Sequence, residues 1–166
     1  MLIYHPAYDA YHCVFRALLI TQLIPKMELS RLRILDFFLC FPGEIRNVRL
    51  PQQQNEARRE AKSLVNEYHG PVNMHHAFRD MQHLQHAAFR SLAASGLFDP
   101  NEFERGVVSR TSANIPDELS GTISAARARD KVAIRCVIDM LGSMSLNGID
   151  GLKDRTGLME HRYDAA

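Results

Sequence analysis

The stretch "MELSRLRILDFFLCFP", residues 27 to 42, decides how the rest of the chain is interpreted. Most of its side chains are apolar, and helical spacing spreads them around most of the helix circumference. It also carries two arginines and an aspartate. Three structures fit this pattern: a buried core helix, a membrane segment, or the first helix of a recognition module.

A membrane segment is disfavoured by the lengths of the apolar runs. The longest are four or five residues, far below the ~20 needed to cross a bilayer. The amino terminus has no basic region ahead of its apolar residues, so no signal peptide is indicated. Three scattered cysteines, Cys13, Cys40 and Cys136, are typical of reduced thiols. We therefore expect a cytoplasmic protein that does not enter a membrane.

Length and composition predict one compact unit. The 166 residues, 46% of them hydrophobic and 23% charged, suffice for a core. We expect a single domain over residues 1 to 150 and a C-terminal segment over 151 to 166. The net charge of +1 gives no general attraction to a polyanion, so nucleic-acid binding would need a local basic patch.

Outside the opening stretch, apolar residues recur at helical spacing. This predicts helices over residues 9 to 23, 56 to 68 and 73 to 96. Asp9 can cap the first of them, and Pro25 ends it. We expect a short extended segment at residues 45 to 50.

The stretch "LAASGLFDPNEFERGVVSRT", residues 92 to 111, links a helix to a β-rich segment through a polar turn. It predicts a β-hairpin over residues 97 to 111, which is how a winged helix often passes from its third helix into its wing. Pro116, followed by two acids, opens a last long helix that reaches Leu141. The predicted fold is mainly α (α+β): a winged-helix-like helical domain with a short β-hairpin wing and a long C-terminal helix. Its expected core includes Leu32, Leu35, Phe38, Leu84, Ala88, Leu92 and Ile134.

The arginines of the opening stretch differ in direction. Arg33, Asp36 and Cys40 share one narrow face, which we expect to be the only outlet of this helix toward solvent. Arg31 points to the apolar side, so we expect its guanidinium to reach an acidic side chain or main-chain carbonyls.

A histidine-rich helix supplies the first candidate recognition face. On a helix, one face would carry His76, Arg79, His83, His86 and Arg90. The His83/His86 spacing suits a metal, but the chain has no HExxH motif and this face has no acid. A solvated or recognition surface without a metal is therefore the better interpretation.

The last long helix supplies a second basic stripe. Arg127, Lys131 and Arg135 follow one another at a spacing of four. They could contact phosphate or an acidic partner, although solvated helices often carry such stripes. Asp130 and Asp139 offset part of their charge.

The sequence contains no familiar catalytic pattern. There is no GxSxG motif, no phosphate-binding glycine loop and no CxxC. Cys13 and His12 are neighbours, and consecutive helical residues do not face each other. We expect neither enzymatic activity nor a cofactor.

Four stretches carry a resemblance to a known family. They are "YHPAYDAYHCVFRALLI" (4 to 20), "ELSRLRILDFFLCFP" (28 to 42), "LQHAAFRSLAASGLF" (84 to 98) and "GLKDRTGLMEHRYD" (151 to 164). The chain resembles the middle component of bacterial three-component ABC ATPase (ABC-3C) systems, the group that includes Lamassu-type antiphage defence. The resemblance implies a winged-helix-like adaptor between an SMC-like ABC ATPase that senses DNA and an effector, commonly a nuclease. It implies no catalytic residues, and it allows contact with DNA within the complex.

Two alternatives belong to other classes. A free-standing winged-helix regulator, dimeric through its first and last helices, would bind a defined duplex alone, and the near-neutral charge argues against it. A metal-dependent enzyme built on the histidines is the weakest alternative.

The C-terminal segment has two interpretations. Its apolar residues need cover, which either the protein's own core or a partner could supply. The partner-binding candidates are Lys153, Arg155, Leu158, Met159, Arg162 and Tyr163.

Overall fold

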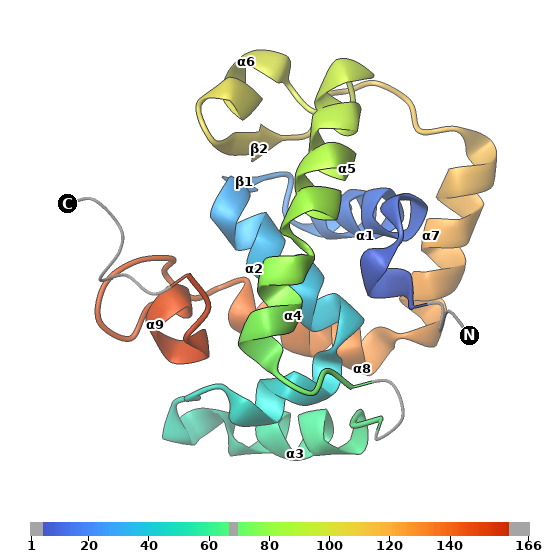
Figure 1. The fold of residues 1–166 in the computed structure, drawn as a ribbon. Helices are drawn as coiled ribbons and strands as arrows, with labels where there is room; N and C mark the ends of the chain where they lie inside the picture. Colours follow the sequence, from blue (N-terminus) through green and yellow to red (C-terminus); the bar gives the residue numbers. More distant parts are fainter. Residues whose placement is uncertain (1–4, 67–69, 160–166) are drawn as a thin grey trace.

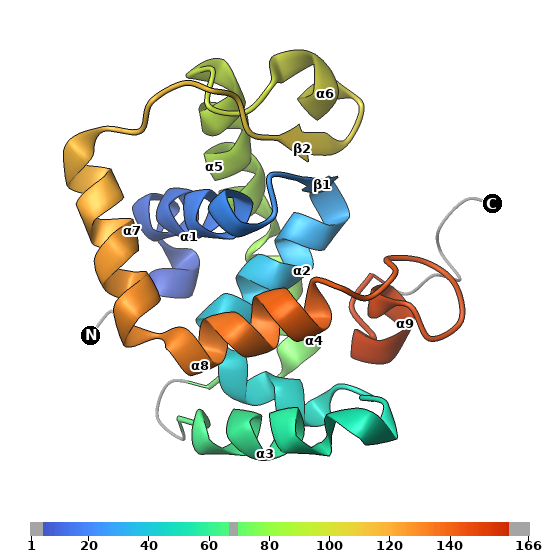
Figure 2. The ribbon, with the colours of Figure 1, turned by 180° about the vertical axis from the view of Figure 1, so that it is seen from behind.

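The centre of the molecule is the helix α2 (Leu29–Cys40), and the computed structural model describes residues 5 to 66 and 70 to 159. α2 lies between α5 (Gln82–Ala94) on one side and the helical segment η4 (Arg135–Leu141), which follows α8 (Lys131–Ile134), on the other (Figures 1 and 2). Its fully buried apolar side chains are Leu32, Ile34, Leu35, Phe37 and Phe38. The opening stretch is therefore a core helix, and no helix of the described ranges has the length and apolarity needed to cross a membrane.

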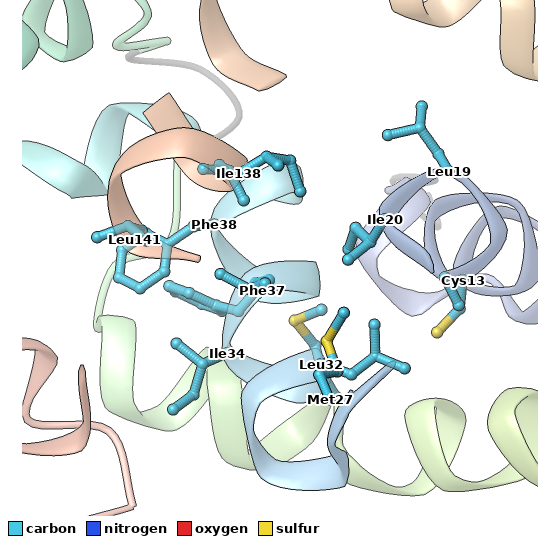
Figure 3. Packing of buried hydrophobic residues seen from close by; sticks show 14 of the residues in the cluster. Cys13, Leu19, Ile20, Met27, Leu32, Ile34, Phe37, Phe38, Ile138 and Leu141 are labelled. Carbon is cyan, nitrogen blue, oxygen red and sulfur yellow. The ribbon is translucent and has the colours of Figure 1, made fainter. Parts of the chain in front are cut away.

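The helix α1 (Ala10–Leu23) packs on α2 and α5 after the short 3₁₀ helix η1 (Pro6–Tyr8). Asp9 accepts a hydrogen bond of 3.0 Å from the backbone N–H of His12, which caps α1 as predicted. Figure 3 shows Ile20 of α1 pointing toward α2 from one side, while Ile138 and Leu141 reach it from another.

Two short strands, β1 (Lys26–Glu28) and β2 (Val107–Ser109), form an antiparallel pair in which Met27 faces Val108. The hairpin predicted within residues 97 to 111 is reduced to one isolated bridge, between Phe98 and Arg110. The polar turn instead forms the helix α6 (Pro100–Glu104), because the Asp99 carboxylate accepts bonds from the first free N–H groups. The strand partner of β2 therefore comes from a distant part of the chain.

The segment after α2 is helical throughout its regular part. It forms the 3₁₀ helices η2 (Pro42–Asn47) and η3 (Gln52–Gln54) and then α3 (Asn55–Ser63), so the expected extended segment at 45 to 50 is wrong. η2 packs closely against the end of α3: a Cβ placed on Gly43 would lie 2.8 Å from the Cα of Val65. Only glycine fits there without movement of the backbone.

The helix predicted over residues 73 to 96 is divided into α4 (Met74–Asp80) and α5. Asn73 caps α4 through a 3.0 Å bond from the backbone N–H of His76. The two helices meet at Met81, which is fully buried. Gly96, with a φ of +79°, ends the second helix as predicted.

The long C-terminal helix is also divided, contrary to the prediction. α7 (Asp117–Arg129) ends at Asp130, whose φ of −104° and ψ of 34° leave the helical region, and α8 then starts a new direction (Figure 2). α8 continues into the π-helical segment η4 (Arg135–Leu141), and Gly142 N–H donates to the carbonyl of Val137, five residues back. No glycine or proline marks the break.

Over the residues that the structure describes, the fold is mainly helical with one small two-stranded sheet, as expected. Leu32, Leu35, Phe38, Ala88 and Leu92 are buried as predicted, whereas Leu84 and Ile134 are half-buried.

Candidate partner-binding surfaces

A cluster of four polar side chains, here called the buried polar cluster, joins three helices: Arg16 of α1, Arg33 and Asp36 of α2, and Gln85 of α5. Arg16 Nε donates to Asp36 Oδ1 at 2.6 Å. Gln85 Nε2 donates to Asp36 Oδ2 at 2.9 Å, and Gln85 Oε1 accepts from Arg33 Nε at 2.9 Å. The amide of Gln85 thus links the two charged residues of α2.

The prediction that the Arg33 and Asp36 face of α2 opens toward solvent is wrong. Asp36 is 0% exposed and Arg33 is 6% exposed, because α1 and α5 cover this face. One sequence signal could have revealed this cluster: each of the three helices carries a polar residue among apolar neighbours.

Electrostatics favour an ionised Arg16. Burial lowers the pKa of Arg16, but the Asp36 carboxylate more than offsets this, and the net pKa is raised. Burial lowers the pKa of Arg33, and Asp36 opposes that effect. The Arg33 guanidinium also lies 4.4 Å above the Phe78 ring, a cation–π contact. The cluster is a structural junction that carries one excess positive charge.

The three cysteines are poor nucleophiles. Burial raises the pKa of Cys13, Cys40 and Cys136, and a neighbouring carboxylate raises each further. Thiols of this kind stay protonated at neutral pH and are therefore unreactive.

The C-terminal segment, as far as residue 159, folds back onto the core through α9 (Leu152–Thr156). Leu158 is 1% exposed and Lys153 is buried, so neither is available as a surface contact in this conformation. Arg31 reaches main-chain carbonyls and an acidic side chain, as predicted: it donates to the carbonyls of Gly142 and Met144, ahead of the segment, at 3.0 and 2.6 Å, and to Glu28 at 2.9 Å.

The other predicted residues of the segment differ in accessibility. Arg155 donates to the carbonyls of Arg49 and Asp150 at 2.6 and 2.7 Å. Met159 is half-buried, and its sulfur accepts from Arg33 at 3.9 Å. Arg162 and Tyr163 lie outside the described residues.

The histidine-rich face runs along α4 and α5 on the outside of the molecule (Figure 1). His76, Arg79, His83 and Arg90 are exposed, and His86 is half-buried. Burial lowers the pKa of His86, and Arg33, Arg90 and His83 lower it further. Within residues 5 to 66 and 70 to 159, no group of three or more histidines, cysteines or acids is placed to hold a metal.

The residues of the second basic stripe lie close together although the helix is broken at Asp130. Arg127, Lys131 and Arg135 are exposed and line one shallow groove of about 600 Å³ together with Leu23 and Ile138. Arg127 donates to Gln22 at 3.3 Å, and Arg135 pairs with Glu60. Lys131 makes no ion pair within the described part of the chain.

The two basic surfaces lie on opposite sides of the molecule. α4 and α5 are in front of α2 in Figure 1, and α8 is in front of it in Figure 2. The histidine-rich face and the second basic stripe are therefore two separate surfaces.

A family model matches residues 2 to 164, which is almost the whole chain; its description is MC5, ABC-three component (ABC-3C) system Middle Component 5. No curated protein and no solved structure compared with the chain matches it.

Proposed function

The chain belongs to this family of ABC-3C middle components, and on that premise we propose that it is the non-catalytic adaptor of a Lamassu-type antiphage defence complex. It bridges an SMC-like ABC ATPase that senses DNA and a nuclease-type effector. Membership of the family supports the expectation that the partners of the chain belong to the same ABC-3C system. The complex acts in the cytoplasm, where the scattered thiols stay reduced.

The observation that carries this proposal is the pair of basic surfaces on opposite faces of one core. A bridging subunit must present two separate surfaces, since two partners cannot occupy one patch. The face on α4 and α5 and the groove lined by Arg127, Lys131 and Arg135 are separated by the thickness of the core around α2. We assign one surface to the ATPase and the other to the effector.

The order of elements supports a winged-helix-like core with an insertion. α1, β1, α2, α5 and β2 follow in the order helix, strand, helix, helix, strand, and β1 pairs with β2. Residues 41 to 81 are then an insertion between the second and third helices. In this arrangement α5 takes the place of the recognition helix, so any DNA contact within the complex would come from its exposed His83 and Arg90, beside the partner subunit that binds the α4 part of this face.

The C-terminal segment is a further candidate contact. We assign Leu158 and Lys153 to holding it on the core, and Arg155 and Met159 to a partner, together with Arg162 and Tyr163. Deletion of residues 151 to 166 separates the two roles: a large fall in melting temperature indicates a core role, and lost association at unchanged stability indicates an interface.

The test of the adaptor function is co-expression with the ATPase and effector encoded in the same gene cluster. We expect a tagged chain to recover both subunits, and each subunit to recover the other only when the chain is present. Direct assembly of the ATPase and effector without it contradicts the bridging role.

A free-standing DNA-binding regulator is the second candidate, and the exposed basic face of α5 favours it. Fluorescence anisotropy of the isolated chain with duplex DNA distinguishes the two. Tight, salt-dependent binding to one defined duplex, without partners, would establish the regulator.

A further inference from the structure

An apolar groove lies beside the break between α7 and α8, and nothing above assigns it a role. Its volume is about 730 Å³, within the range of pockets that take a ligand or several side chains. Its apolar lining includes Phe15, Leu19, Leu39, Leu64, Val132 and Ile134. These side chains come from α1, α2, the end of α3 and α8, so the groove is a product of the tertiary fold.

The break at Asp130 forms one wall of this groove. Residues on both sides of it, from Ala126 to Ile134, contribute to the lining. The altered direction of α8 leaves Val132 38% exposed, although valine is a residue that proteins usually bury. A large apolar side chain of the lining thus remains uncovered.

The rim of the groove is basic. Arg129 and Lys131 line it with Asp130; Arg129 and Asp130 form an ion pair of 3.0 Å, whereas Lys131 makes no ion pair within the described part of the chain. Lys131 also lines the adjoining shallow groove, where Arg127 and Arg135 add positive charge and Asp139 adds one negative charge. An apolar floor bordered by positive charges is complementary to an amphipathic segment with acidic flanks.

We propose that this groove binds an acidic amphipathic helix of one partner subunit, with the apolar side of that helix on the groove floor and its carboxylates against Arg127 and Lys131. The inference rests on the proposed adaptor function and names the partner surface. A second copy of the chain is a poorer occupant, because a two-fold contact would place the same basic rim against itself. DNA is poorer too, since phosphates gain nothing from the apolar floor.

The test uses the full chain co-expressed with the ATPase and effector of its gene cluster. Val132→Asp places a charge on the groove floor at an already exposed position. The matched control is Val72→Asp, because Val72 is 108% exposed and lies before α4, away from the groove lining. We expect Val132→Asp to weaken association with one subunit by roughly tenfold or more, at an unchanged melting temperature, while the control associates normally.

Charge reversal provides a second variant that removes no apolar contact. Arg127→Glu combined with Lys131→Glu should weaken the same association and reduce its salt dependence. A photo-crosslinking benzoylphenylalanine at position 132 should cross-link that subunit, and one at position 72 should not.

The outcomes separate this inference from the adaptor function. If the wild-type chain recovers neither subunit, both fail. If it recovers both, and both sets of groove variants also do, only the groove assignment fails. Loss of self-association alone, or loss of DNA binding with partner binding intact, also overturns the groove assignment.

Discussion

The buried polar cluster predicts a large effect of one isosteric change, Asp36→Asn. The carboxylate of Asp36 is 0% exposed and accepts from Arg16 at 2.6 Å, while the Arg16 side chain is only 7% exposed. Water therefore cannot replace the lost partner of Arg16. Removing one member of such a pair costs about 3 to 5 kcal/mol, a large part of the ~5 to 15 kcal/mol that stabilises a typical domain.

The assay is urea denaturation followed by circular dichroism, with thermal melts as a second measure. For a chain of this size, the loss corresponds to a fall in Tm of about 6 to 20 °C. The exposed Asp139→Asn is the matched control and should change the free energy of unfolding by less than about 0.5 kcal/mol. The double variant Arg16→Met/Asp36→Leu should be more stable than Asp36→Asn, because no unpaired charge remains buried. An Asp36→Asn variant as stable as the control would refute this account of the cluster.

Four further predictions concern stability. Arg31→Ala should lower the free energy of unfolding by about 1 to 3 kcal/mol in urea melts, because main-chain carbonyls lose their donor; an unchanged value would contradict it. Gly43→Ala should cost about 1 to 3 kcal/mol, because its Cβ meets the backbone of Val65. Gly121 lies within α7, and the space where its Cβ would lie is open, so Gly121→Ala should instead raise the free energy of unfolding by about 0.5 to 1 kcal/mol. Equal melting temperatures of the Gly43→Ala and Gly121→Ala variants would contradict this pair of predictions. The pKa of His86 is lowered by burial, so the unfolded chain binds more protons as the pH falls through about 6.5. Stability should therefore decrease below that pH and be regained above it, and His86→Gln should show a weaker pH dependence in urea melts.

The elements that were predicted correctly carry local signals. α1 begins at a capping aspartate and ends before a proline, and α2 has an apolar periodicity that no strand would show. The contacts of Arg31 followed from its direction on α2 alone. Such features depend on residues a few positions apart, which the sequence displays directly.

The features that were missed depend on distant residues. Asp36 looks like half of a surface pair with Arg33, yet its partners lie 20 and 49 positions away in sequence. β1 is only three residues long, too short for an alternating pattern to predict pairing with β2. The break at Asp130 has no helix-breaking residue, so the groove that it creates could not be anticipated either.

The central position of α2 has a consequence for folding during synthesis. α2 is made early in the chain, but the side chains of α5 and η4 that cover it come much later. Until they emerge, a largely apolar helix has no cover, and this is the condition in which nascent chains aggregate or are held by chaperones. The core can close only after residue 141 has been added, and a chain interrupted before that point has no route to the native packing around α2.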